Sequence, residues 1–271
     1  MKTKYPLSVL IFSVGLFIGG TLFGLFLFNY LTDTSTDNDY MMQDEDDMEE
    51  MMDDMIGDYS DIKINFQKIE EETDLYSATL TYPVITSSNK SLEKDFNDEV
   101  YKLFHNDLEA IKKASSDDAE FIKESGNKYS IGIDTSLSFQ NDELISFITD
   151  GYVYYGGAHG SSAGHNITYS TKDKKLIEIS DLFRDDSYLD YLSEVSRAQL
   201  RQQDWYDETL SDEWVITGTE PKEDNFSLFY LTEDSLVITL AEYQVAPYAA
   251  GQQKVIVDYD ELNQMLTLEI N

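Results

Sequence analysis

The residues best suited to chemistry lie close together in residues 152–165, which read YVYYGGAHGSSAGH. This segment holds two of the chain's three histidines, together with the adjacent serines Ser161 and Ser162. Residues 160–164 match the G-x-S-x-G pattern of a nucleophile elbow, which requires a strand before the serine and a helix after it. The residues that follow are rich in β-formers. A hydrolase that combines His159, Ser161 or Ser162 and a carboxylate is therefore an alternative rather than the leading interpretation.

A metal site is a second alternative for the same histidines. His159 and His165 do not have the spacing of a common zinc signature, and the third histidine, His105, lies far upstream. Carboxylates would have to complete a metal-dependent enzyme centred on His159. The simplest interpretation is a glycine-rich crossing between strands, in which His159 is a hydrogen-bonded structural residue. The sequence therefore predicts no catalytic residue, no metal ligand and no cofactor.

Alternating apolar and polar residues around this segment predict hairpins of antiparallel strands. The expected strands are residues 77–85, 129–139 with 144–155, 167–170 with 176–179, and 226–231 with 236–240. Two amphipathic helices are expected, at about Ser91–Lys113 with Asn89 or Ser91 as the cap, and at about Tyr188–Gln203. The predicted fold is α+β, with antiparallel sheets and helices packed on one face.

The N-terminal part of the chain predicts a single membrane anchor. No charged residue lies between Lys4 and Asp33, and residues 6–31 are long enough to cross a hydrocarbon core of about 30 Å. A cleaved signal peptide is the competing interpretation, but its apolar region would be shorter and would end at a small-residue cleavage site. Since two lysines precede the span, residues 1–5 form a cytoplasmic stub and the rest lies outside the cell membrane.

The predicted span also permits a homodimer. Gly15, Gly19, Gly20 and Gly24 repeat the small-xxx-small spacing that lets two membrane helices approach closely. Glycine is common in such helices, so this spacing permits a dimer without requiring one. The chain has no cysteine, so the apolar segment itself and not a lipid on cysteine must be the anchor.

Residues 32–58 form an acidic segment that contains twelve Asp or Glu and no Lys or Arg. Self-repulsion and the shortage of aliphatic and aromatic side chains predict a disordered tether. The segment also holds six of the eight methionines, Met41, Met42, Met48, Met51, Met52 and Met55. Their thioethers suit Cu(I), so metal capture is an alternative role for the tether.

Several blocks of the remaining sequence share a recognisable pattern with the segment YGGAHG at residues 155–160. They are YPVI at 82–85, IEISDLF at 177–183, NF at 225–226, LAEYQVAPYAAG at 240–251 and VIVDYDEL at 255–262. Together they resemble the RsiV-like family of bacterial extracytoplasmic domains over residues 61–268. This family includes the outer portion of a lysozyme-sensing anti-sigma factor and the non-catalytic region of some peptidoglycan deacetylases. The resemblance implies an N-terminal α+β subdomain at residues 59–156 and a C-terminal one at 157–271.

Two departures from the family limit what this resemblance implies. The five residues before the predicted span are too few to hold a sigma factor. No deacetylase domain with its metal-binding motifs follows before Asn271. We therefore expect a binding module of the cell envelope, involved in sensing or protection, and not an enzyme.

The charge of the chain favours a cationic partner. The chain carries 53 acidic and 19 basic residues, and without the tether acids, Lys2 and Lys4 the formal charge of residues 59–271 is about −24. Such a field excludes nucleic acid as a partner and attracts basic proteins, of which a lysozyme-like protein is the first expectation. Cell-wall glycan is the second, because the 19 tyrosines and the two tryptophans, Trp205 and Trp214, offer ring faces that can stack on sugars. The charge could also serve only to keep an exposed protein soluble.

The ligand-binding surface is expected where glycine, aromatic and proline residues gather at loops of adjacent hairpins. The expected residues are Gly156, Gly157, His159, Gly160, Tyr243, Pro247 and Tyr248.

Overall fold

The computed structural model describes residues 61–262 and 264–267, which all belong to one compact unit. The predicted cytoplasmic stub, the membrane span with its glycine pairs and the methionine-rich tether lie outside the described residues. Among the helices that are described, none combines the length and the apolar character needed to cross a bilayer.

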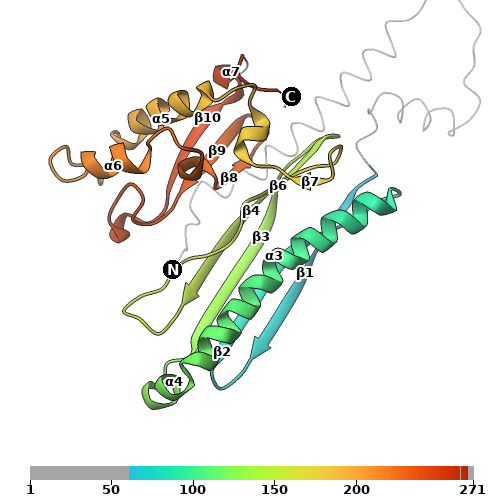
Figure 1. Ribbon diagram of the computed structural model, residues 1–271, viewed down its shortest axis with the longest axis vertical. Helices are drawn as coiled ribbons and strands as arrows, with labels where there is room; N and C mark the ends of the chain where they lie inside the picture. Colours follow the sequence, from blue (N-terminus) through green and yellow to red (C-terminus); the bar gives the residue numbers. More distant parts are fainter. Residues whose placement is uncertain (1–60, 263, 268–271) are drawn as a thin grey trace, which may run out of the picture. The chain divides into compact units, whose positions relative to one another are not determined.

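A large mixed sheet forms the first layer of the fold (Figure 1). Its strand order is β1-β2-β3-β4-β6-β7, and β5 also pairs with β4. The strands are β1 (Lys63–Glu72), β2 (Tyr76–Thr86), β3 (Tyr129–Gln140), β4 (Leu144–Tyr154), β5 (Ser161–Ser162), β6 (Ile167–Ser170) and β7 (Lys175–Leu176). The predicted β3–β4 hairpin is confirmed. The β6–β7 hairpin is confirmed in part, because the chain turns into the 3-10 helix η1 (Ile179–Leu182) after Leu176.

The expectation of purely antiparallel sheets is wrong for one pair of strands. Strands β2 and β3 run parallel, with Tyr76 opposite Tyr129. The helices α3 (Lys90–Asp117) and α4 (Ala119–Ser125) connect them. A parallel pair needs such a crossover, because the chain must return to the end of the sheet from which it started.

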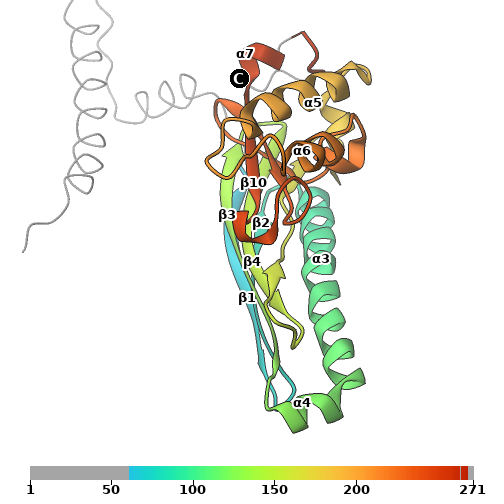
Figure 2. The ribbon, with the colours of Figure 1, turned by 90° about the vertical axis from the view of Figure 1, so that its left-hand side faces the viewer.

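Helix α3 covers one face of the large sheet (Figures 1 and 2). It buries Leu92, Phe96, Val100, Phe104, Leu108 and Ile111 against the sheet. Its apolar stripe confirms the predicted first helix, although the helix continues beyond Lys113 to Asp117. Asn89 caps it, since its side chain accepts a hydrogen bond from the backbone N–H of Leu92 at 3.1 Å.

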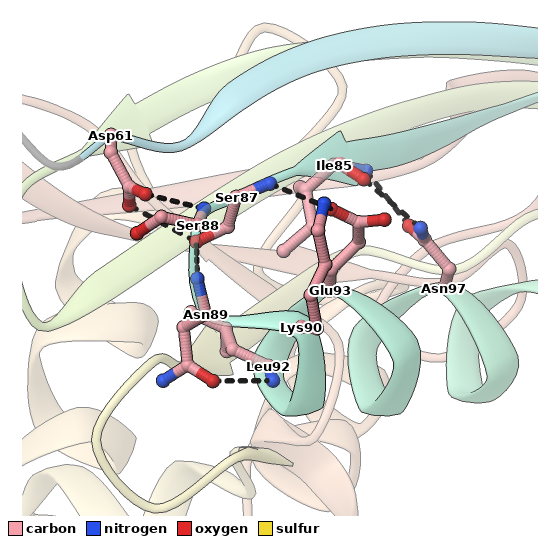
Figure 3. A network of polar contacts seen from close by, with 9 residues as sticks. All are labelled: Asp61, Ile85, Ser87, Ser88, Asn89, Lys90, Leu92, Glu93 and Asn97. Carbon is pink, nitrogen blue, oxygen red and sulfur yellow. Dashed lines mark hydrogen bonds and ion pairs between the residues drawn. The ribbon is translucent and has the colours of Figure 1, made fainter.

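The start of α3 is tied to β2 by a network of polar contacts (Figure 3). The Asp61 carboxylate accepts hydrogen bonds from the hydroxyl of Ser87 at 3.0 Å and from the backbone N–H of Ser88 at 2.5 Å. The backbone N–H of Ser87 donates to Glu93 at 2.9 Å. The bonds from Ser88 and Ser87 hold the pKa of the Asp61 carboxyl below its usual range. The Lys90 ammonium, 2.7 Å from the Glu93 carboxylate, and the Ser87 N–H lower the pKa of Glu93. Together these contacts join the end of β2 to the first turn of α3.

A second, three-stranded sheet follows in the order β10-β9-β8. Its strands are β8 (Phe229–Leu231), β9 (Ser235–Leu240) and β10 (Gln253–Asp258), and its helices are α5 (Ser187–Leu200), α6 (Asp212–Gly218) and α7 (Tyr259–Leu262). The 3-10 helices η2 (Glu223–Phe226) and η3 (Tyr248–Ala250) complete this part. The predicted β8–β9 hairpin and the predicted second helix, which ends at Leu200, are confirmed.

The two sheets meet at a buried junction. The Ser146 hydroxyl accepts a hydrogen bond from the backbone N–H of Leu231 at 2.9 Å and lies 2.9 Å from the hydroxyl of Thr168. The large sheet also continues past Gly156, because β5, β6 and β7 all pair into it. The residues expected to begin the second subdomain thus complete the sheet of the first.

Gly218, at the end of α6, provides a test of the packing in the second part. A Cβ atom at Gly218 would overlap the backbone carbonyl of Gln244, whereas a Cβ at Gly132 in β3 would meet nothing within 4 Å. We expect Gly218→Ala to lower the free energy of unfolding by about 3 kcal/mol, because backbone atoms cannot move aside. The control Gly132→Ala should be neutral or stabilising by about 0.5–1 kcal/mol. Thermal unfolding of both variants measures the difference, and equal melting temperatures would contradict this packing.

The network at Asp61 predicts an acid-sensitive contribution to stability. Because its folded pKa is lowered, the contribution is present above the unfolded pKa of about 4 and is lost as the pH falls through the lower folded value. Asp61→Asn should therefore lower the melting temperature at pH 7 and flatten its decline between pH 5 and pH 2. Unfolding measured across this pH range checks the prediction. A variant curve parallel to that of the unmodified chain would refute it.

Candidate functional site

Four rings form an exposed cluster beside the junction of the two sheets. The imidazole of His159 stacks on Tyr248 with 3.9 Å between the ring centroids. The ring of Tyr243 lies 5.7 Å from Tyr248 and 6.4 Å from Trp214. Tyr243 is 53% exposed and Trp214 is 37% exposed, so the cluster presents ring surface to solvent. We call these four residues the aromatic cluster.

The loop after β9 positions two of these rings at a cost in backbone strain. Tyr243 has a φ of +67°, a left-handed backbone conformation that residues other than glycine adopt rarely. The side-chain amide of the next residue, Gln244, donates to the carbonyls of Gly218 at 2.9 Å and Asn225 at 3.0 Å. Its oxygen accepts from the N–H of Ala241 at 2.9 Å. These bonds fix the turn that displays Tyr243.

The loop between β4 and β5 provides the other side of the cluster. Gly160 is buried, and its carbonyl accepts a hydrogen bond from the Tyr248 hydroxyl at 2.9 Å. A Cβ atom at Gly160 would overlap the ring of Tyr152, so a side chain at this position would have to displace that exposed ring. His159 Nδ1 lies 2.9 Å from the same carbonyl, and its Nε2 lies 3.5 Å from the Tyr243 hydroxyl.

Most of the expected binding residues therefore come together, and the others support their loop. His159, Gly160, Tyr243 and Tyr248 are in mutual contact. Pro247 is exposed and immediately precedes η3. Gly156 and Gly157 lie outside these ring contacts. Gly156 has a φ of +74° and packs beneath the Tyr129 ring. The Gly157 carbonyl accepts a hydrogen bond from the Tyr154 hydroxyl at 3.1 Å.

A groove of about 370 Å³ lies next to the cluster, between β4 and the ends of β9 and β10. Its lining includes Asp150, Ser162, Glu242 and Lys254. The Glu242 carboxylate accepts from the backbone N–H of Ser162 at 3.2 Å and from its hydroxyl at 2.5 Å. This pair holds the loop after β9 against β5.

The hydrogen bonds of the serine and histidine do not favour the hydrolase alternative. The Ser162 hydroxyl donates a hydrogen bond to the Glu242 carboxylate. The two ring nitrogens of His159 face the Gly160 carbonyl and the Tyr243 hydroxyl. No described contact links His159 to Ser161 or Ser162, and a nucleophile and its base need that link.

The metal alternative also lacks a ligand set among the described residues. His165 lies against α3, where its Nε2 is 2.8 Å from the Asp107 carboxylate. Across residues 61–262 and 264–267, no three His, Cys, Asp or Glu side chains come together as a metal site would require.

The sequence indicated Trp214 only as a ring that could stack on sugars, and it did not single out Tyr152, Asp150 or Glu242 for this site. Trp214 belongs to α6, which is far along the chain from the other rings. The close packing of Gly218 on Gln244 and the hydrogen bond between them hold α6 beside the Tyr243 turn. A signal was available for Tyr152, since it alternates with Asp150 on one face of β4.

Two family models match this chain in succession. Residues 69–162 match the family described as deacetylase PdaC, and residues 180–260 match a family described as a protein of unknown function, DUF3298. Among curated proteins, the anti-sigma-V factor RsiV of Bacillus subtilis (strain 168) is 28% identical over 218 residues, which cover 76% of this chain and 71% of RsiV. The peptidoglycan-N-acetylmuramic acid deacetylase PdaC of the same organism is 27% identical over 186 residues. That match covers 64% of this chain and only 39% of PdaC.

Solved structures show the same fold at low sequence identity. A DUF3298 family member from Bacteroides fragilis NCTC 9343 superposes with a TM-score of 0.57 at 18% identity, covering 78% of this chain and 95% of that one. A DUF3298 family protein from Pseudomonas aeruginosa PAO1 gives a TM-score of 0.51 at 14% identity, covering 79% and 98%. The mixed α+β architecture is thus shared with this family. The blocks noted in the sequence, the two consecutive family matches and the similarity to RsiV agree, and together they support a relationship between this chain and the RsiV-like extracytoplasmic domains.

Proposed function

We propose that this chain is a membrane-anchored binding module of the cell envelope, and that its aromatic cluster binds a basic, lysozyme-like protein. The anchor in this proposal is residues 6–31, and the bound protein is sensed outside the membrane. The similarity to an anti-sigma factor supports a role in envelope sensing. The family resemblance supports the lysozyme-like partner.

The exposed aromatic cluster is the observation that carries the proposal. Tyrosine and tryptophan dominate the energetically important positions of protein interfaces, because they bury a large area at a small entropic cost and keep a polar edge. Here Tyr243 and Trp214 remain exposed, although the domain buries other aromatic side chains in its apolar core. The strained φ of Tyr243 is consistent with display of the ring for a ligand.

The charge of the domain supports a cationic ligand for this surface. Residues 59–271 carry a formal charge of about −24, and Asp150 and Glu242 line the groove next to the rings. Opposite charge speeds encounter and favours the correct partner more than it adds to affinity. The rings then supply the contact area and the surrounding acids supply the attraction.

The role that we propose is binding without catalysis. Ser162 and Glu242 form a hydrogen-bonded pair that holds two loops together, which gives the serine a structural role. PdaC, which is named as a deacetylase, is matched over only 39% of its length, so its activity is not carried over to this chain.

Removal of the two central tyrosines tests the cluster. Tyr243→Ala combined with Tyr248→Ala should weaken binding of a C-type lysozyme by at least 30-fold, since each buried aromatic anchor is worth about 1–2 kcal/mol or more. Tyr101→Ala is the matched control, because Tyr101 is 46% exposed on α3 away from the cluster. Calorimetry on the whole chain in zwitterionic nanodiscs measures both variants. Equal affinities for the double variant and the control would remove the cluster as the binding surface.

Salt separates specific recognition from general attraction. Binding of the lysozyme should weaken but persist as salt rises, because the buried aromatic contact is not screened. A cationic protein of similar size and charge, such as a cytochrome c, should bind weakly and lose its binding at high salt. If both proteins lose binding in parallel, the acidic surface is generic. Peptidoglycan fragments are the third ligand in this series, and binding of these alone would favour the cell-wall glycan.

A further inference from the structure

The face of the large sheet opposite α3 carries an open surface beside the aromatic cluster. Side chains at alternate positions of a strand point to the same side. On this side, Asp150, Tyr152 and Tyr154 of β4 lie opposite Asp134, Gly132 and Ser130 of β3. Figure 2 shows α3 on one side of β1–β4 and no described helix over the lower part of the other side. Both aspartates and Tyr152 are exposed.

Two like charges face each other directly on this surface. Asp134 and Asp150 are register partners in the β3–β4 ladder, so their Cβ atoms are about 5 Å apart. Among the described residues, neither carboxylate has a hydrogen bond or an ion pair. Like charges in this position destabilise a sheet. A locally unfavourable pair that the rest of the fold tolerates is typical of a functional surface.

This pair is continuous with the candidate site. Asp150 lines the groove together with Glu242, whose neighbour in the chain is Tyr243. On the same face of β4, the Tyr152 ring lies against Gly160, the residue that accepts the hydrogen bond of Tyr248. The open surface and the aromatic cluster therefore lie next to each other.

The cations of the domain do not neutralise the pair. Lys254 also lines the groove, but its ammonium group lies 5.6 Å from the centroid of the Tyr230 ring and 3.5 Å from the Tyr230 hydroxyl. Lys68 of the edge strand β1 forms an ion pair with Glu70. The negative charge at Asp134 and Asp150 is left for a partner.

We propose that Asp134 and Asp150 receive an arginine or lysine side chain of the basic partner, so that the binding surface extends from the aromatic cluster onto the open face of β3 and β4. This inference rests on the proposed function. A cation between the two carboxylates forms charge-assisted hydrogen bonds with them and removes their mutual repulsion at the same time. Arginine suits the position particularly well, since its planar fork can engage both carboxylates. A neutral glycan has no group that does this, so the surface favours a protein.

The experiment compares two charge-matched double variants of the whole chain in zwitterionic nanodiscs. Asp134→Asn with Asp150→Asn removes the pair, and Glu233→Gln with Asp234→Asn removes two exposed acids from the distant β8–β9 turn. Surface plasmon resonance with a C-type lysozyme gives the affinity and its salt dependence, and thermal unfolding gives the stability. We expect the first variant to bind about 5- to 20-fold more weakly with a shallower salt dependence, and to melt about 1–3 °C higher. The control variant should bind within twofold of the unmodified chain.

The outcomes separate this inference from the proposed function. If Asp134→Asn with Asp150→Asn binds as tightly as the control variant, the inference is wrong, while loss of binding in the Tyr243 and Tyr248 variant leaves the proposed function in place. If both charge variants weaken binding equally, the effect is general electrostatics and the inference is also wrong. If the unmodified chain does not bind lysozyme at all, both proposals fall. The single variant Asp150→Asn repeats the comparison with the least change to the sheet.

Discussion

The buried hydroxyl of Ser146 is the constraint on which the geometry of the site depends. Ser146 is fully buried, and it accepts a hydrogen bond from the Leu231 N–H of the second sheet while it contacts Thr168 of the first. A buried N–H without a partner would cost about 1–3 kcal/mol, so one relative placement of β4, β6 and β8 is preferred over its neighbours. The groove and the loops that carry His159, Tyr243 and Tyr248 follow from that placement, because they lie at the ends of β4 and of β9, which pairs with β8.

Polar contacts farther along the junction also fix the placement of the two sheets relative to each other. The Asn166 side chain accepts from the N–H of Thr149 at 3.2 Å and donates to the hydroxyl of Thr239 at 3.2 Å. The Ser162 and Glu242 pair closes the end of the junction next to the aromatic cluster. Apolar burial drives the two sheets together without a preferred register, whereas directional hydrogen bonds select one. A rigid junction can then hold exposed rings in a fixed arrangement, which lowers the entropy lost on binding.

In the function that we propose, the surface combines two kinds of interaction that act at different stages of binding. The net negative charge acts over a distance of about a Debye length and determines how often a cationic partner arrives. The aromatic cluster acts only on contact and determines how long the partner stays. Placing Asp150 and Glu242 next to the rings connects the two stages, because an arriving cation is drawn to the edge of the contact area.

The sequence by itself determined the local structure and the sign of the charge. Periodicity located α3, α5 and the β3–β4 and β8–β9 hairpins, since these signals arise from neighbouring residues. The same reasoning missed β1, whose residues KINFQKIEEE are mostly exposed at the edge of the sheet, and it missed the parallel pairing of β2 with β3. Both depend on contacts between distant segments. The loops around His159 and Tyr248 were expected to converge, but only the tertiary structure gave the contacts between their rings and added Trp214 and the groove. The physical reason is that the junction of the two sheets, and not any local preference, sets the distance between these loops.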